Sequence, residues 1–166
     1  MQNLFLGLEK NGSKLIDFKF ENKLNKTIIG VDEVGRGPWA GPVVAVACLF
    51  LDKKNSLVNT NLFDDSKKLT KQKRNICYKH ILYLKKKSLI KFYIGKASVE
   101  EIDNINILQA SMLAMSRAIK SFPNKYSKKA LIIIDGNKQP KLKNFNIKAI
   151  IKGDEKSLST AAASII

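Results

Sequence analysis

Two apolar, strand-like runs joined by a glycine- and proline-rich loop constrain the fold of this chain more than any other feature. The first run, TIIGVDEV at residues 27–34, is rich in β-branched residues and contains two adjacent carboxylates, Asp32 and Glu33. The loop GRGPWAGP follows directly, and the second run, VVAVACLFL, occupies residues 43–51. β-Branched runs bounded by glycine and proline are typical of strands. The continuous apolarity of the second run predicts a strand that is buried on both faces.

Strand-like and helix-like segments alternate along the rest of the chain. We expect further strands at residues 89–96, 130–135 and 147–151, helices at residues 70–86 and 106–120, and a helix that begins within residues 155–166. Ser98 and Glu101 have the spacing of a capping box, which predicts a short turn before the second helix. Five strands interleaved with helices, without internal repeats, predict an α/β fold with a central mixed five-stranded sheet flanked by helices.

The composition indicates a folded, strongly basic protein. Of the 166 residues, 45% are hydrophobic, which excludes disorder for the whole chain, and the longest apolar run is strand-sized, which predicts no membrane span. Lys and Arg outnumber Asp and Glu by 30 to 14, so the formal net charge is +16. This charge favours a polyanionic partner such as nucleic acid. AT-biased coding is a second explanation, because the chain is rich in Lys, Asn and Ile and has only three arginines.

The cysteines and the first residues bear on the compartment. Cys48 and Cys77 lie in separate apolar patterns without a CxxC motif, which favours a reducing compartment. The first ten residues have no basic start and no long apolar stretch, so they do not resemble a secretory signal. We therefore expect a cytoplasmic protein, and we expect it to be a monomer. The single histidine, His80, falls on the apolar side of a predicted helix and is expected to be a packed residue.

Four carboxylates stand apart from the other acids, most of which lie among lysines. Asp32 with Glu33, then Asp135, and then Asp154 each follow an apolar strand-like run and have a glycine nearby. Burial of such groups costs desolvation and mutual repulsion, which a divalent cation would offset. Taken singly, an aspartate beside a glycine is also a turn signal, but three such places in one chain favour a shared site.

Ligands that are all oxygen select hard cations, Mg²⁺ or Mn²⁺, over zinc. Two such ions about 3.5–4 Å apart can clamp the attacking and leaving oxygens of a phosphodiester. Lysines would then hold a polyanion that the metal site cuts. Adjacent residues of a regular strand face opposite sides, so Asp32 and Glu33 can address one site only if the strand loses regularity there. The glycines and proline of residues 35–41 predict such a break.

Five segments of the chain, in the same order, resemble the successive blocks of ribonuclease HII. They are GVDEVGRGPWAGPVVAVA at 30–47, DSKKLT at 65–70, EIDNINILQASMLAMSRAI at 101–119, LIIIDGNKQPKL at 131–142 and IIKGDEKSLSTAAASII at 150–166. The resemblance implies an RNase H-like fold and metal-dependent cleavage of RNA in RNA–DNA hybrid duplexes, including single ribonucleotides embedded in duplex DNA. It covers the chain from about Phe18 onward. Residues 18–166 are therefore expected to form the catalytic domain and residues 1–17 an N-terminal extension.

The resemblance also implies roles for individual residues. The family's metal-binding and catalytic carboxylates match Asp32, Glu33, Asp135 and Asp154, which would hold Mn²⁺ or Mg²⁺, as two ions. The glycine-arginine-glycine loop that contacts the ribonucleotide 2′-hydroxyl matches Gly35, Arg36 and Gly37, and the arginine favours the HII class over HIII. The phosphate-contacting stretch matches Ser66, Lys67 and Lys68. A contact to the 2′-hydroxyl is also what distinguishes RNA from DNA chemically.

The chain departs from the family pattern at its end. In the family the AAASII block continues through a further helix, a tyrosine that stacks at the RNA–DNA junction, and C-terminal helices, whereas this sequence stops at Ile166. We therefore expect a catalytic domain that lacks the family's closing helices. The alternative to an active enzyme is a truncated, catalytically impaired nucleic-acid-binding protein that retains the fold. The hydrophobic residues Leu15, Phe18 and Phe20 suggest a short strand or edge extension near the start.

Overall fold

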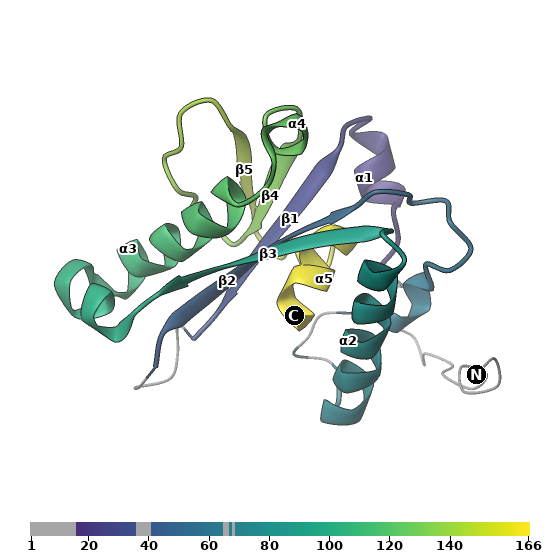
Figure 1. Cartoon of the computed structure of the whole chain (residues 1–166), viewed down its shortest axis with the longest axis horizontal. Coiled ribbons are helices and arrows are strands. Elements are labelled where there is room, and N and C mark those ends of the chain that lie inside the picture. Colours follow the sequence, from purple (N-terminus) through teal and green to yellow (C-terminus); the bar gives the residue numbers. More distant parts are fainter. Residues whose placement is uncertain (1–15, 36–40, 65–66, 68) are drawn as a thin grey trace.

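The computed structural model describes residues 16–35, 41–64, 67 and 69–166, with a five-stranded mixed sheet at the centre (Figure 1). The helices are α1 (Lys19–Lys23), the 3₁₀ helix η2 (Thr60–Leu62), α2 (Lys71–Lys86), α3 (Val99–Lys120), α4 (Asn124–Ser127) and α5 (Leu158–Ile165). The strands are β1 (Ile28–Val34), β2 (Val43–Phe50), β3 (Ile90–Ala97), β4 (Leu131–Asp135) and β5 (Asn146–Ile150). The predicted α/β class is confirmed. Among these described helices, none is long and apolar enough to span a membrane.

The sheet has the strand order β3-β2-β1-β4-β5. β1 and β2 are antiparallel, as are β2 and β3, so the first three strands form a meander. β4 lies parallel to β1 on its other side, and β5 lies parallel to β4. The carboxyl ends of β1, β4 and β5 therefore meet at one end of the sheet, which is where open α/β sheets place their functional groups.

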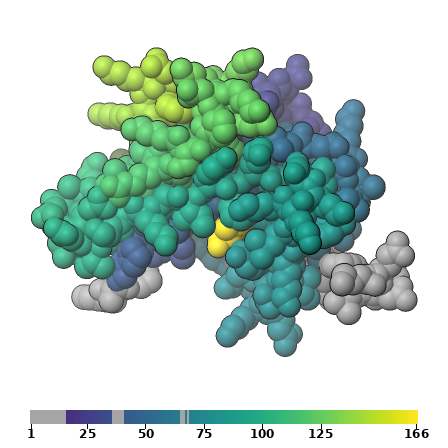
Figure 2. Space-filling model, viewed as in Figure 1, coloured from purple at the N-terminus to yellow at the C-terminus, as the bar shows by residue number. Residues whose placement is uncertain are grey.

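Helices cover both faces of the sheet (Figure 1). On one face, α3 packs against Val31, Ala45 and other alternate residues of the central strands, all without exposed surface. On the other face, α2 and α5 pack around Phe50 and Phe63, whose rings lie 5.8 Å apart in an edge-to-face arrangement. Figure 2 shows a notch beside α2 in which the yellow atoms of the chain's last residues are visible. The continuously apolar sequence of β2 is explained by these two covered faces.

The α5 helix packs on β1 at a distance that leaves room only for glycine. A Cβ atom built on Gly30 would lie 2.1 Å from the backbone nitrogen of Thr160 and 2.2 Å from the carbonyl carbon of Ser159. Real Cβ atoms do not approach other heavy atoms so closely, so this contact fixes the glycine in the middle of an otherwise β-branched strand. Gly30 thus sets how deeply the start of α5 sits against the sheet.

The α3 helix consists of two segments joined at Asn106, as the sequence predicts. Asn106 has a φ of 67° and a ψ of 163°, and its side-chain oxygen accepts hydrogen bonds from the backbone N–H groups of Leu108 and Gln109, each 3.1 Å away. Asn106 therefore acts as the N-cap of the second segment, which carries the buried face of α3.

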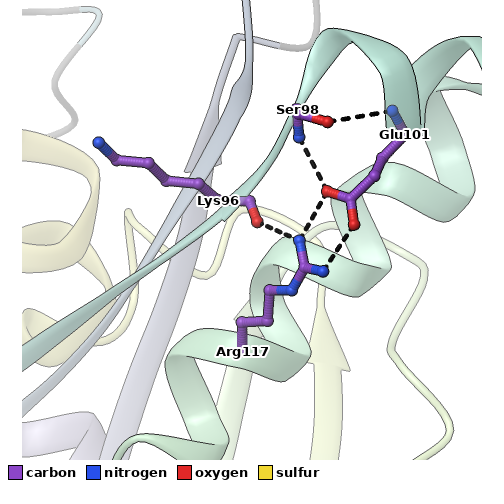
Figure 3. Close-up of polar contacts among 4 residues, drawn as sticks. All are labelled: Lys96, Ser98, Glu101 and Arg117. Atoms are coloured by element: carbon purple, nitrogen blue, oxygen red, sulfur yellow. Dashed lines mark hydrogen bonds and ion pairs between the residues drawn. The ribbon is translucent and has the colours of Figure 1, made fainter.

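Arg117 ties the two segments of α3 together (Figure 3). Its guanidinium donates to both carboxylate oxygens of Glu101, at 2.6 and 2.7 Å, and to the carbonyl of Lys96 at 2.6 Å. Glu101 also accepts from the backbone of Ser98, which completes the predicted capping box. The hydrogen bonds from Arg117 and from the Ser98 backbone lower the pKa of Glu101 to about 2, so the ion pair persists well below neutral pH.

The chain differs from expectation before β1. Residues 19–23 form the short helix α1 instead of a strand, and Phe18 packs its ring edge-to-face on Phe50 at 5.1 Å. Phe18 therefore anchors a helical turn on the core, which its apolar character alone could not distinguish from a strand. His80 is packed as predicted: it is 8% exposed, its Nε2 accepts from the Asn59 N–H at 3.3 Å, and burial lowers its pKa.

Candidate metal centre

Three acidic residues from neighbouring parts of the fold lie together at one end of the sheet. Asp32 lies near the end of β1, Asp135 is the last residue of β4, and Asp154 lies in the turn between β5 and α5. Because β1, β4 and β5 are adjacent and parallel, the order of strands in the sheet brings together residues that are distant in the sequence. The convergence expected of these three aspartates is present.

The cluster is tight. One carboxylate oxygen from each of Asp32, Asp135 and Asp154 lies within 4.8 Å of the corresponding oxygens of the other two. Asp154 is buried, with 4% of its surface exposed, and the other two are half-buried. Three acidic groups at this separation and burial repel one another strongly unless protons or cations intervene.

The electrostatics of Asp32 show this repulsion. The pKa of Asp32 is raised from 3.8 to about 8, mainly by burial and in addition by the negative charges of Asp135 and Glu33. A hydrogen bond from the Glu33 backbone N–H, at 2.8 Å, acts in the opposite direction but is the weaker influence. The folded protein therefore keeps a proton on Asp32 at neutral pH when no cation is bound.

Local hydrogen bonds orient Asp135 and the turn that carries Asp154. The Gly153 N–H donates to Oδ1 of Asp135 at 2.7 Å and thus joins the end of β4 to the residue just before Asp154. The motif LIIIDG shows Asp135 but not this partner, because the bond spans 18 residues. Gly153 is a residue of the site that sequence patterns did not identify.

Glu33 lies on the other face of β1. The strand pairs regularly with β2 through Val34, with Asp32 opposite Val46 and Glu33 opposite Ala45. Val46 belongs to the core beneath α2 and α5, whereas Ala45 belongs to the core beneath α3. The expected loss of regularity at Asp32 and Glu33 is therefore wrong: the strand ends only after both residues. Within the described chain, the three-acid cluster does not include Glu33, although its charge acts on Asp32.

The predicted substrate-binding residues are only partly within the described chain. Gly35 directly follows β1 and is half-buried, and Lys67 is exposed in the connection between η2 and α2. The other four predicted residues lie outside the described residues; they are Arg36, Gly37, Ser66 and Lys68.

The donor set fits a hard divalent cation. All the converging groups are carboxylates, and the chain's only histidine and both its cysteines lie elsewhere in the core. Oxygen-only sites of this kind bind Mg²⁺ or Mn²⁺. Burial, and after it the charges of the neighbouring acids, raise the pKa of Asp32, and a bound cation would favour the ionised carboxylate against both effects.

The metal-free protein should therefore lose stability as the pH rises. The pKa of Asp32 is higher in the folded than in the unfolded chain, so its stabilising proton is fully retained below about pH 4 and is lost as the pH approaches 8. Asp32→Asn removes the charge but keeps an oxygen that can accept from the Glu33 N–H. In chelator at pH 8, we expect the variant to be more stable than the wild type by about 3 kcal/mol.

Thermal unfolding in chelator at pH 5 and pH 8 measures this effect. The advantage of Asp32→Asn should be small at pH 5 and large at pH 8, and saturating Mn²⁺ should reverse it at pH 8 by stabilising the wild type alone. An advantage of equal size at both pH values would contradict the assignment of the shift to the acid cluster.

Comparison with known sequences gives one family. The family model of ribonuclease HII matches residues 29–166. Ribonuclease HII of Wolbachia sp. subsp. Drosophila simulans (strain wRi) is 46% identical over 153 residues, which cover 92% of this chain and 71% of that protein. Ribonuclease HII of Pelagibacter ubique (strain HTCC1062) is 50% identical over 141 residues, which cover 85% of this chain and 69% of that protein.

Solved structures give the same fold. Ribonuclease H2 from Pyrococcus horikoshii OT3 superposes with a TM-score of 0.61 at 26% identity, over 84% of this chain and 69% of that one. Bst-RNase HIII, solved in complex with Mn²⁺, superposes with a TM-score of 0.62 at 16% identity, over 95% of this chain and 56% of that one. The predicted RNase H-like fold is confirmed.

Proposed function

The chain belongs to the ribonuclease HII family and is an endoribonuclease, and we propose that it uses divalent cations to cut RNA within duplexes. The proposed substrates are RNA–DNA hybrids and single ribonucleotides embedded in duplex DNA. The proposed products carry 5′-phosphate and 3′-hydroxyl ends. One observation carries the proposal: Asp32, Asp135 and Asp154 place carboxylate oxygens within 4.8 Å of one another.

The charge of the protein supports a polyanionic substrate. The chain has a formal net charge of +16, yet it gathers three acids at one end of its sheet. A protein that only binds nucleic acid gains nothing from a negative cluster that faces phosphates, because like charges repel. A cluster that holds cations reverses the local charge and can bring a phosphodiester to the site.

We assign Asp32, Asp135 and Asp154 to cation binding. We propose Glu33 as a fourth ligand, which requires the end of β1 to change conformation when a cation binds, because Glu33 lies on the other face of the strand. When bound, a pair of Mg²⁺ or Mn²⁺ ions supplies the charge that activates water and stabilises the leaving 3′-oxygen. The protein's own part is to orient the oxygens. Asp135 is held by the Gly153 N–H, and Asp32 by the Glu33 N–H, so both carboxylates are oriented before a cation arrives.

Recognition of the ribonucleotide is assigned to the loop after β1. Gly35, Arg36 and Gly37 would contact the 2′-hydroxyl, and Ser66, Lys67 and Lys68 would contact phosphates. The start of this loop lies next to the cluster along the chain, since Gly35 is three residues beyond Asp32. A 2′-hydroxyl contact beside the cutting site would restrict cleavage to RNA.

Cleavage of a duplex that contains one ribonucleotide tests the proposal. We expect nicking in Mg²⁺ or Mn²⁺, no nicking in excess chelator, and no nicking of the all-DNA duplex of the same sequence. End-labelling of the products identifies the 5′-phosphate and 3′-hydroxyl ends. Cleavage that persists in chelator would refute the metal mechanism.

The alternative, a catalytically impaired binding protein, predicts a different result. Such a protein shifts the hybrid duplex in a gel, with the shift weakening as salt rises, but gives no metal-stimulated product.

We further propose that the protein acts as a monomer in the cytoplasm. Cys48 and Cys77 are free, buried thiols, which supports a reducing compartment. Sedimentation of the purified protein, alone and with duplex, tests the proposed monomer.

A further inference from the structure

A completely buried carboxylate connects α1 to the start of α5. Glu21 has no exposed surface, and its Oε1 accepts hydrogen bonds from the Ser157 hydroxyl and from the Ser159 N–H, both at 2.8 Å. Its Oε2 lies 2.9 Å from the ammonium group of Lys53, which is 18% exposed. Glu21 lies outside residues 29–166, which match the family model. Its contacts with Ser157 and Ser159 span more than 130 residues of sequence.

Hydrogen bonds hold the turn that carries Asp154 at both its start and its end. At its start, the Gly153 N–H donates to Asp135. Within the turn, the Ser157 N–H donates to the Gly153 carbonyl at 2.8 Å, which closes the turn around Asp154. At its end, Ser157 is held by Glu21 and caps α5 by accepting from the Thr160 N–H. Asp154 therefore projects from a short closed turn that is fixed on both sides.

The charge of Glu21 is compensated at the place where it is buried. Lys53 neutralises one oxygen, and the first backbone N–H groups of α5 favour negative charge at the other. Burial of a carboxylate costs desolvation, so an apolar residue would suffice if filling space were the only task of Glu21. The geometry of Glu21 instead indicates that it braces the start of α5, that is, fixes its position, because Oε1 binds both the cap residue Ser157 and Ser159.

We propose that Glu21 is a positioning residue that holds Asp154 in place for cation binding by bracing Ser157 and Ser159. This inference rests on the proposed function, since it assumes that Asp154 binds a cation. Glu21 does not touch the cluster itself; it acts through the turn. Loss of the brace frees the start of α5 and lets Asp154 move relative to Asp135 and Asp32, which weakens cation binding before it affects duplex binding.

Calorimetric titration of chelator-treated protein with Mn²⁺ tests the role without relying on activity. We expect Glu21→Ala to weaken Mn²⁺ binding about tenfold or more, the range seen when partners behind metal ligands are removed. Glu21→Gln keeps an oxygen for Ser157 and Ser159, and we expect it to stay within about threefold of the wild type. In cleavage assays, Glu21→Ala should require more Mn²⁺ for half-maximal rate while the KM for duplex stays unchanged at saturating Mn²⁺.

Two further variants separate positioning from general stability. Met115→Ala removes a buried side chain of α3, on the opposite face of the sheet, so it should lower the melting temperature but leave Mn²⁺ binding unchanged. Ser157→Ala keeps Glu21 and should weaken Mn²⁺ binding severalfold even if Glu21→Ala does not fold. Ser127→Ala, at a buried serine of α4, is its matched control and should leave Mn²⁺ binding unchanged.

The outcomes distinguish the inference from the proposed function. If folded Glu21→Ala and Ser157→Ala both bind Mn²⁺ like the wild type, the positioning role of Glu21 is overturned and the nuclease assignment is untouched. If the wild type binds Mn²⁺ but cuts no ribonucleotide-containing duplex, the nuclease assignment is overturned, and weaker binding by the two variants still supports the brace.

Discussion

Asp135→Asn is expected to abolish cleavage while leaving the protein folded. Asparagine has nearly the same shape as aspartate and keeps an oxygen that can accept from the Gly153 N–H, so the join between β4 and the Asp154 turn survives. The substitution removes one of the three charges that lie within 4.8 Å of one another. Because the proposed chemistry depends on bound cations, we expect the rate on a duplex with one ribonucleotide to fall by about three orders of magnitude or more.

Single-turnover cleavage in Mn²⁺ and Mg²⁺ measures the loss, and thermal unfolding in chelator verifies the fold. Asp52→Asn is the matched control, because Asp52 is exposed just beyond the other end of β2 and accepts short-range hydrogen bonds from Lys54 and Asn55. The control should cut like the wild type. Cleavage by Asp135→Asn within tenfold of the wild-type rate would contradict the assignment of Asp135 to the metal centre.

Features that depend on neighbours in the sequence were predictable. The cap at Thr70 fixes the start of α2, where its hydroxyl accepts from the Lys73 N–H. The capping box of Ser98 and Glu101 and the new start at Asn106 fix both segments of α3. These signals are local because each cap bonds to backbone groups within three residues.

The convergence of the aspartates was predictable for a different reason. Asp32 and Asp135 follow apolar strands, and parallel strands bring such ends together. The position of Glu33 was not predictable. The loop glycines indicate that the strand ends nearby but not at which residue, and the pairing with β2 continues past Glu33 to Val34. The helical form of residues 19–23 and the brace from Glu21 depend on contacts with β2 and α5, which no local pattern reveals.

Gly30→Val is expected to have the largest effect on stability. The position looks like any other in a β-branched strand, and valine is a better strand former than glycine. Any Cβ at this position would nevertheless lie 2.1 Å from the Thr160 nitrogen and 2.2 Å from the Ser159 carbonyl carbon. Both are backbone atoms, so no side-chain rotation relieves the clash and α5 must move off the sheet. We expect a loss of more than about 4 kcal/mol, which leaves a protein of this size unfolded or molten.

Urea unfolding, followed by circular dichroism, measures the loss of unfolding free energy. Gly30→Ala is a milder form of the same substitution, because it adds only the Cβ atom. Gly41→Ala is the matched control. Gly41 has a φ of 117° but open space around a Cβ, so alanine there should cost only about 1–2 kcal/mol of backbone strain. If Gly30→Ala costs no more than Gly41→Ala, α5 does not rest on β1 as tightly as the structure shows. The turn that carries Asp154 would then lack the support from which we derive a preformed metal centre, since this turn leads directly into α5.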